Sequence, residues 1–203
     1  LTAHLKDKVG KNIGLAFGAL AARIFNMQSR RKAFEIGKAH YDKGNDLYAA
    51  MLDARLTYTC GYWKDISPPP QSSPIKGEEN TNSPPPVGGV REGGTALDRA
   101  QEAKLDMVCK KIGLKRGDRV LDIGCGWGSF AKFAAERYGA NVVGITVSKA
   151  QIELGRKMCE GLPIELRLQD YREVKDGPYD HAISLGRFEH VGYKNYRTYM
   201  EVV

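Results

Sequence analysis

Three glycines at alternate positions, Gly124, Gly126 and Gly128, directly follow the apolar run 120–123. Glycine lacks a Cβ atom, so such a loop lets a ligand lie against bare backbone. The next segment, 129–138, has the apolar spacing of a helix. A strand, a glycine loop and a helix in this order form the first half of a nucleotide-binding unit, and the loop suits an adenosyl cofactor. A tight turn with no ligand is the alternative.

The spacing of the glycines argues against a dinucleotide. The dinucleotide fingerprint is G-x-G-x-x-G, whereas Ser129 leaves the pattern G-x-G-x-G here. The acidic residue expected about 20 positions later, which would hold a ribose hydroxyl, is also missing. The next strand ends instead at 146–148, Thr-Val-Ser, where hydroxyl groups and the Gln151 amide could bind the ribose. Hydride transfer is therefore less expected than chemistry on an adenosyl group.

Three further segments carry residues that could act on a ligand. The aromatic run 58–63, Tyr-Thr-Cys-Gly-Tyr-Trp, could close over it as a lid, or could be a packed aromatic strand. Segment 169–172, Gln-Asp-Tyr-Arg, could bind and stack on a base, or could be a plain turn. Segment 186–192 places Glu189 and His190 beside each other, as a catalytic pair or as structural residues.

The elements that position these segments alternate between strand and helix, which predicts an α/β fold with a parallel sheet. Right-handed crossovers predict the strand order 3-2-1-4, with the ligand crevice between the first and fourth strands. The fourth strand is expected to be an exposed edge. The expected strands are 119–123, 141–145, 164–168 and 181–185, and the expected helices are 46–52, 96–112, 129–138 and 149–161.

The chain divides into three parts by composition. Residues 1–66 read as a helical amino-terminal segment that includes the lid, and 96–203 as the main domain. Between them, 67–95 contains the proline triplets 68–70 and 84–86 and too few apolar residues to offset chain entropy. We expect this insertion to be disordered.

The amino-terminal segment contains the amphipathic pattern 13–27, followed by the basic cluster 30–32. Such a helix could lie on a membrane surface, or could pack on the main domain. The net charge of +7 also permits nucleic-acid binding, but the sequence contains no recognised nucleic-acid module. We therefore expect no nucleic-acid partner.

The cysteines form no C-x-x-C pair, and no histidine cluster has zinc spacing. We expect neither disulfides nor a metal site, which fits a reducing cytoplasm. No leader peptide is visible, and 13–27 is too short to span a bilayer. The cysteines are Cys60, Cys109, Cys125 and Cys159.

Together these segments resemble the cyclopropane-fatty-acyl-phospholipid synthase family, including the mycolic acid cyclopropane synthases. The combination of Gly-Cys-Gly-Trp-Gly with Phe-Glu-His is far more specific than a generic methyltransferase loop. The resemblance covers nearly everything outside the insertion. It runs through 28–30, 37–42, 44–46, 58–63, 100–105, 120–128, 142–148 and 188–192.

The resemblance implies the Rossmann-like sheet of a class I methyltransferase and S-adenosylmethionine as cofactor. It implies bicarbonate near the transferred methyl group, with Cys60 and Glu189 as ligands and His190 as a further catalytic residue. Thr59 replaces the commoner serine, and Arg187 stands where a small or apolar side chain is usual. The implied cofactor contacts are Tyr58, Thr59, Val120, Leu121, Asp122, Ile123, Gly124, Cys125, Gly126, Trp127, Gly128, Thr146, Val147, Ser148, Lys149, Ala150, Gln151, Tyr171 and Arg172.

The implied reaction adds a methylene group to the cis double bond of an unsaturated phospholipid acyl chain. A carbocation forms and loses a proton to bicarbonate, and the ring closes. The resemblance places such an enzyme in the cytoplasm, on the inner face of the membrane, and is compatible with a homodimer. It also implies that the chain lacks the later strands, with a further histidine, tyrosine and cysteine. A methyltransferase of another acceptor, or an inactive cofactor-binding fragment, is the alternative.

Overall fold

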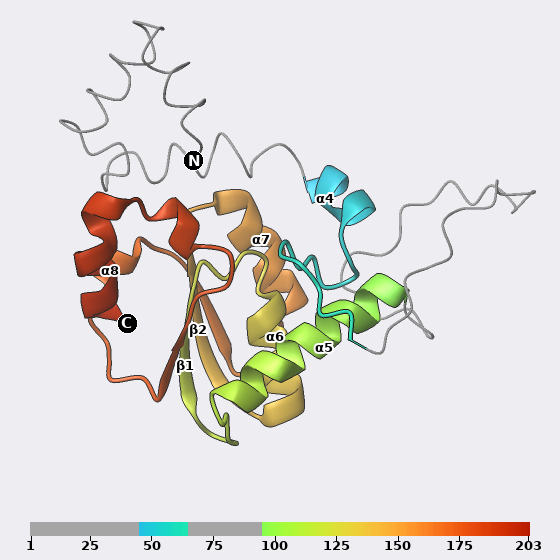
Figure 1. Cartoon of the computed structure of the whole chain (residues 1–203), viewed down its shortest axis with the longest axis horizontal. Helices are drawn as coiled ribbons and strands as arrows, with labels where there is room; N and C mark the ends of the chain where they lie inside the picture. Colours follow the sequence, from blue (N-terminus) through green and yellow to red (C-terminus); the bar gives the residue numbers. More distant parts are fainter. Residues whose placement is uncertain (1–44, 65–94) are drawn as a thin grey trace, which may run out of the picture.

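The computed structural model describes residues 45–64 and 95–203. The amphipathic pattern 13–27 and nearly all of the expected insertion lie outside these residues. Within them, four parallel strands form one sheet in the order β3-β2-β1-β4, which confirms the predicted order (Figure 1). The strands are β1 Arg119–Ile123, β2 Asn141–Thr146, β3 Ile164–Leu168 and β4 His181–Ile183.

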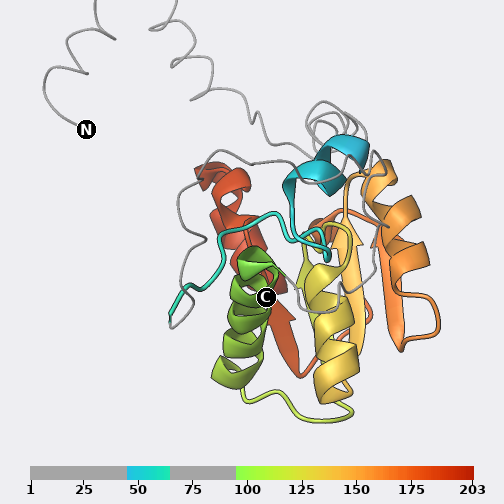
Figure 2. The same ribbon diagram turned by 90° about the vertical axis from the view of Figure 1, so that its right-hand side faces the viewer.

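The helices lie on both faces of this sheet. Figure 2 shows α5, α6 and α7 side by side on one face, with α4 beyond the carboxyl ends of the strands. The short α8 covers the other face, where Tyr199 packs with Leu121 and Ile145 (Figure 1). The helices are α4 Asn45–Met51, α5 Ala96–Lys111, α6 Ser129–Tyr138, α7 Lys149–Met158 and α8 Tyr196–Val202, with 3-10 turns η1 Tyr171–Glu173, η2 Phe188–His190 and η3 Tyr193–Asn195.

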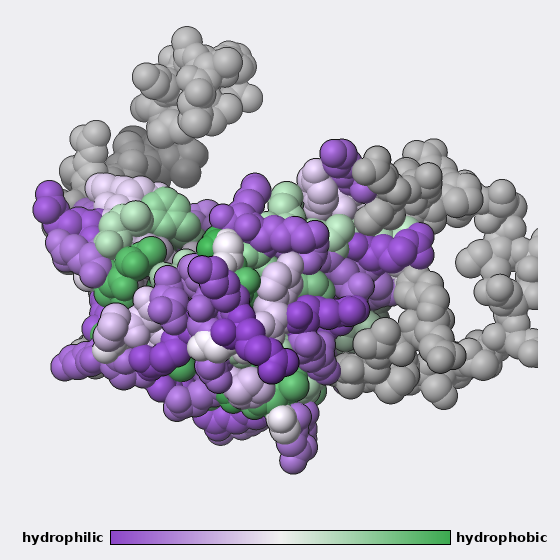
Figure 3. Space-filling view, turned by 90° about the horizontal axis from the view of Figure 1, so that it is seen from below, coloured by the Kyte–Doolittle hydropathy of each residue, from purple (hydrophilic) through white to green (hydrophobic). Residues whose placement is uncertain are grey.

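The two faces of the sheet follow from the alternation of side chains along β1. Val120 points toward α5 and α6, where it packs in a core with Leu105 and Phe130. Leu121 points the other way, into the core beneath α8. Because both faces are covered, β1 is apolar on both sides, and Asp122 is its only buried acidic residue. At the amino ends of the strands, the surface is mainly hydrophilic, with apolar residues in separate patches (Figure 3).

The ends of the helices show why each begins and stops where it does. Thr95 and Asp98 form a reciprocal capping box at the start of α5. Helix α6 ends at Gly139, whose left-handed conformation (φ +70°) favours glycine. Helix α7 ends three residues earlier than expected, at Met158, because Cys159 leaves the helical conformation ahead of the left-handed Gly161.

Two other expectations differ from the structure. Strand β4 ends at Ile183, two residues before the expected end, and within the described residues it pairs only with β1. The aromatic run 58–63 is irregular rather than a strand. Gln101 on α5 donates hydrogen bonds to the carbonyls of Thr57 and Thr59, so a helix side chain rather than a neighbouring strand satisfies this backbone.

Helix α7 packs directly against the backbone of the glycine loop. A Cβ atom at Gly155 would lie 2.8 Å from the carbonyl oxygen of Trp127 and 2.9 Å from Leu166 Cδ1. Backbone cannot swing away as a flexible side chain can. The Gly155→Ala variant should therefore lose about 1–3 kcal/mol of unfolding free energy, although alanine favours helix formation.

Urea denaturation measures this loss. The control is Lys157→Ala, which changes an exposed residue of the same helix and should alter the unfolding free energy by no more than about 0.5 kcal/mol. A Gly155→Ala variant as stable as the native protein would show that α7 and the loop are not in close contact.

Candidate functional site

A pocket opens at the carboxyl ends of β1, β2 and β4, beneath the irregular segment that follows α4. This is the crevice that the strand order predicts. Predicted cofactor residues that line it are Tyr58, Thr59, Asp122, Ile123, Gly124, Cys125, Gly126, Trp127, Thr146, Val147, Gln151 and Tyr171.

The other predicted residues do not line this pocket. Val120 and Leu121 lie in the two cores, and Gly128 packs beside Cys159 and Leu166. Cys60, Glu189 and His190 are exposed. The remaining predicted residues outside the lining are Ser148, Lys149, Ala150 and Arg172.

The glycine loop is held open by backbone hydrogen bonds. The amides of Gly124 and Cys125 both donate to the carbonyl of Ile145, at 2.8 and 3.0 Å. Gly124 and Gly126 have φ values of +88° and +58°, a region that favours glycine. A Cβ atom at Gly126 would meet nothing within 4 Å. The loop therefore offers free space and bare backbone on its pocket side.

Helix α4 fixes the aromatic side chain of this loop. Trp127 is 1% exposed, and its Nε1 donates to Asn45 Oδ1 at 2.9 Å. The Tyr48 ring packs 4.8 Å from the Trp127 ring and 5.5 Å from the Tyr58 ring, between ring centres. Segment 45–64 is thus attached to the loop at its start, and Tyr58 follows over the pocket.

Side chains of α5 also hold segment 45–64 in place. Lys104 Nζ donates to Thr59 Oγ1 at 2.6 Å, and Gln101 Nε2 donates to the Thr59 carbonyl at 2.7 Å. Asp53 accepts hydrogen bonds from both the backbone amide and the hydroxyl of Thr57. A Cβ atom at Gly186 would lie 2.6 Å from Thr59 Cγ2, so the residues after β4 touch this segment from the other side.

Asp122 is the charged group at the base of the pocket. Its side chain is buried, and its Oδ2 has no hydrogen-bond partner within the described part of the chain. Burial raises the pKa of Asp122 to about 7, while the positive charge of Lys104 opposes that rise. Burial also lowers the pKa of Lys104. The pocket therefore contains a carboxylate that lacks a donor and gains from a cationic ligand.

The end of β2 provides neutral polar groups. Thr146 Oγ1 donates to Gln151 Oε1 at 2.9 Å, and both side chains line the pocket. Ser148 caps α7 by accepting from the Gln151 amide, which explains why it lies outside the lining. Hydroxyl and amide groups thus stand where a dinucleotide site would have a carboxylate, as the sequence indicates.

At the end of β3, Asp170 does not face the pocket as an acid that binds a base would. Asp170 is 1% exposed, and its carboxylate accepts from Arg172 Nε at 2.7 Å. Burial alone would raise the pKa of Asp170, but the hydrogen bonds from Arg172 hold it below its usual value. Gln169 and Tyr171 line the pocket here instead, and the hydroxyl of Tyr171 is buried without a partner among the described residues.

The end of β4 brings the exposed candidates close to the pocket mouth. A Cβ atom at Gly186 would lie 3.9 Å from Glu189 Oε1, and Gly186 also touches Thr59, the neighbour of Cys60. Glu189 and His190 belong to the exposed turn η2. Glu189 thus lies beside the lining residue Gly186 and outside the pocket itself. In the described ranges no three histidine, cysteine or acidic side chains gather as a metal site.

Sequence reasoning missed several lining residues. Lys104 had a detectable signal, because it interrupts the apolar stripe of a helix and must reach a partner. Arg187 follows a strand at the switch point, and its stem lies over Gly124. The lining residues that were not among the predicted cofactor contacts are Leu56, Thr57, Lys104, Ser129, Phe130, Ile145, Gln169, Leu185, Gly186 and Arg187.

Comparison with known proteins gives the family. The family described as mycolic acid cyclopropane synthetase matches residues 28–203. The chain belongs to this family. It is 41% identical over all of its 203 residues to a cyclopropane-fatty-acyl-phospholipid synthase of Escherichia coli, and 39% identical over 167 residues to a probable fatty acid methyltransferase of Pseudomonas putida. These matches cover 46% and 36% of the two relatives, so the chain spans about half the length of the first and about a third of the second.

Solved structures agree with this assignment. A mycolic acid cyclopropane synthase in complex with SAH and CTAB superposes with a TM-score of 0.65 at 31% identity, over 83% of this chain and 51% of the other. A cyclopropane synthase from Mycobacterium tuberculosis gives 0.63 at 30% identity, over 82% of this chain and 50% of the other. The fold is therefore the Rossmann-like methyltransferase fold. No helix of the described residues is long and apolar enough to cross a membrane.

The buried carboxylate at the base of the pocket predicts a pH-dependent stability. The pKa of Asp122 is raised to about 7 in the folded protein and is near 3.8 when unfolded. Its stabilising contribution is thus complete below about pH 4 and is lost as the pH rises through 7. Asp122→Asn should match the native protein near pH 4 and exceed its stability by a few kcal/mol at pH 8, at about 1.4 kcal/mol per pKa unit.

Thermal or urea unfolding between pH 4 and pH 8 measures this difference in the absence of ligand. Asp46→Asn is the control, because that carboxylate lies on the surface of α4. Parallel pH profiles for Asp122→Asn and the native protein would contradict the prediction.

Proposed function

We propose that this chain forms the S-adenosylmethionine-binding part of an enzyme that adds a methylene group to unsaturated phospholipid acyl chains. The observation that carries the proposal is the unpartnered, buried carboxylate of Asp122 beside the open glycine loop. The cofactor has an ammonium group that this carboxylate would bind, which would remove the cost of burying an isolated acid.

The other lining residues fit the rest of the cofactor. Gly126 leaves free backbone for close approach, because a Cβ atom there would meet nothing within 4 Å. Thr146 and Gln151 would bind the ribose hydroxyls. Gln169 and Tyr171 would contact the adenine ring. Bound S-adenosylmethionine would supply an electrophilic methyl group on a sulfonium, and the residues of this chain would fix its direction.

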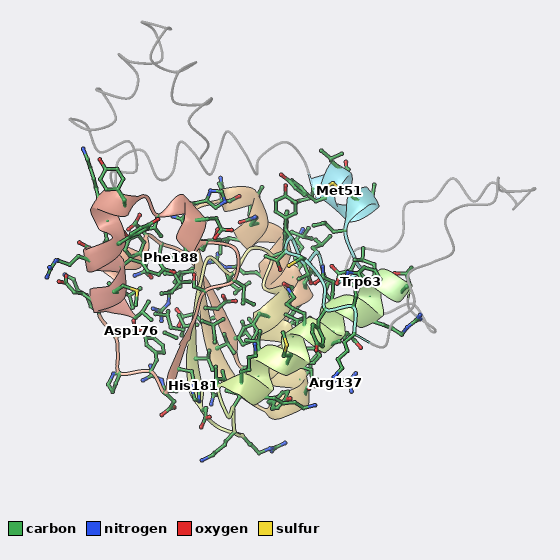
Figure 4. All side chains as sticks on the ribbon, viewed as in Figure 1. Met51, Trp63, Arg137, Asp176, His181 and Phe188 are labelled. Carbon is green, nitrogen blue, oxygen red and sulfur yellow. The ribbon has the colours of Figure 1, made fainter. Side chains whose placement is uncertain are left out.

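The acceptor is proposed from the family and from the surface around the pocket. The E. coli relative is named for cyclopropane fatty-acyl phospholipids. Leu47 and Met51 of α4 are 55% and 50% exposed, and Phe188 is 41% exposed. In Figure 4, Met51 and Phe188 lie at the same end of the sheet as the pocket. Apolar side chains there would receive an acyl chain, and peripheral contact with a membrane is part of the proposal.

Proton removal completes the proposed reaction. An alkene is a weak nucleophile, so a positively charged carbon must be tolerated. The added methyl group must then lose a proton, and the electrons of its C–H bond close the ring. Bicarbonate would supply the base. Glu189 would accept a hydrogen bond from the hydroxyl of the bicarbonate. Cys60 would lie across from Glu189, because its neighbour Thr59 contacts Gly186. Tyr58, a lining residue that is 54% exposed, would stabilise positive charge through the face of its ring.

A second function follows from the exposure of the catalytic candidates. Cys60, Glu189 and His190 stand outside the pocket lining. With these groups outside the lining, the pocket would bind the cofactor and leave the acceptor unchanged. Lipid turnover, measured alongside cofactor binding, separates this function from the first.

Cofactor binding should depend on the charge of Asp122. Below about pH 7 this side chain is protonated and offers no counter-ion to the ammonium group. The affinity for S-adenosylhomocysteine should therefore fall by up to about tenfold per pH unit below 7. Asp122→Asn should bind more weakly at pH 8 and lack this pH dependence.

Isothermal titration calorimetry between pH 5.5 and pH 8 measures both effects, with Asp46→Asn as the surface control. An affinity that does not change with pH in the native protein would remove Asp122 as the ammonium ligand. Failure to bind at any pH would remove the proposed function itself.

Turnover should depend on Glu189 without a change in cofactor affinity. Glu189→Gln keeps the shape of the side chain but removes the carboxylate that would orient the base. We expect turnover to fall by about 100-fold or more. Mass spectrometry of phospholipid vesicles detects the gain of one CH₂, and ozonolysis of the same lipid shows whether the double bond has been replaced by a ring. Equal losses in turnover and in cofactor affinity would sink the assignment, and a gain of CH₂ with the double bond retained would indicate a simple methyltransferase.

A further inference from the structure

Arg187 crosses the glycine loop at the mouth of the pocket. A Cβ atom at Gly124 would lie 2.9 Å from both Cβ and Cγ of Arg187, and 3.2 Å from its Cδ. The aliphatic stem therefore lies flat on the backbone of Gly124, where a larger residue would push it away. Arg187 also lines the pocket that contains Asp122, and its charge acts on Asp170 and Tyr171 at the end of β3.

Among residues 45–64 and 95–203, the guanidinium of Arg187 forms no hydrogen bond or salt bridge, unlike those of other arginines around the site. By contrast, Arg55 pairs with Glu102 and Glu136, and Arg172 pairs with Asp170. The field of Arg187 reaches Asp170, but that carboxylate is already occupied. A half-buried guanidinium without a counter-ion gains most from an anionic ligand.

The pocket thus contains two side chains of opposite charge, Asp122 and Arg187, that form no ion pair with the described part of the chain. The amino-acid end of the proposed cofactor carries an ammonium and a carboxylate on the same carbon atom. Lys104, the other cation of the lining, donates to Thr59 at 2.6 Å and is less available.

We propose that Arg187 binds the carboxylate of the cofactor's amino-acid end while Asp122 binds its ammonium group. This inference rests on the proposed function, because it assumes an adenosyl amino acid in the pocket. Arg187 then acts as a positioning residue. It fixes the direction of the sulfonium by holding the far end of the molecule, and it favours adenosyl compounds that carry a carboxylate over those that lack one.

Two ligands that differ only at this end provide the test. S-adenosylhomocysteine carries the amino acid, whereas 5′-methylthioadenosine lacks it. The Arg187→Met variant keeps an apolar stem over Gly124 and removes the charge. It should bind S-adenosylhomocysteine about tenfold or more weakly, because a charge-assisted contact is lost, and should bind 5′-methylthioadenosine within about twofold of the native affinity.

Calorimetry on three further variants completes the design. Arg197→Met makes the same change at an exposed residue of α8 and should leave both affinities unaltered. Arg187→Lys should retain part of the S-adenosylhomocysteine affinity. Lys104→Met should not reproduce the selective loss, and if it alone does so, Lys104 is the carboxylate ligand and the inference is wrong.

The outcomes separate this inference from the proposed function. An equal loss for both ligands in Arg187→Met would assign Arg187 a packing role, and unchanged affinities would assign it none. Either result overturns the inference while leaving cofactor binding intact. A native protein that binds neither ligand would overturn the proposed function, and the inference with it.

Discussion

The burial of one carboxylate, Asp122, at the end of β1 is the constraint around which the site is arranged. Removing an isolated charge from water is unfavourable, so a buried acid must either find a partner or take up a proton. Here its pKa rises to about 7, and Lys104 of α5 supplies a compensating charge. The same lysine donates to Thr59, so the group that balances the acid also holds the segment above it. The charge at the base and the cover of the pocket are thus coupled through one side chain.

The glycine loop depends on close packing from two sides. Helix α7 approaches its backbone at Gly155, and α4 secures Trp127 by a hydrogen bond and by the Tyr48 ring. Neither contact touches the face of Gly126 that is open to the pocket. Rigid support behind the loop and free space in front of it are what a cofactor site requires, because binding then orders little additional structure.

Much of the framework was predictable because its signals are local. The strand order and the extents of β1, β3 and α6 follow from apolar periodicity, from glycine positions and from the handedness of crossovers. The length of the edge strand was less predictable. Strand β4 is shorter than its apolar run, because pairing rather than composition ends a strand. Segment 58–63 was expected as a lid or a strand, and its irregular backbone depends on Gln101, more than 40 residues away in the sequence.

The sequence by itself determined that a glycine loop follows an apolar strand, that neutral groups replace the ribose-binding acid, and that Phe-Glu-His follows the fourth strand. Only the tertiary structure decided which polar side chains face the pocket. Asp170 turns to Arg172, whereas Arg187 lies over Gly124 and lines the pocket. The physical reason is that backbone conformation follows local residue types, but the direction of a side chain after a strand depends on which distant atoms leave room for it and complete its hydrogen bonds.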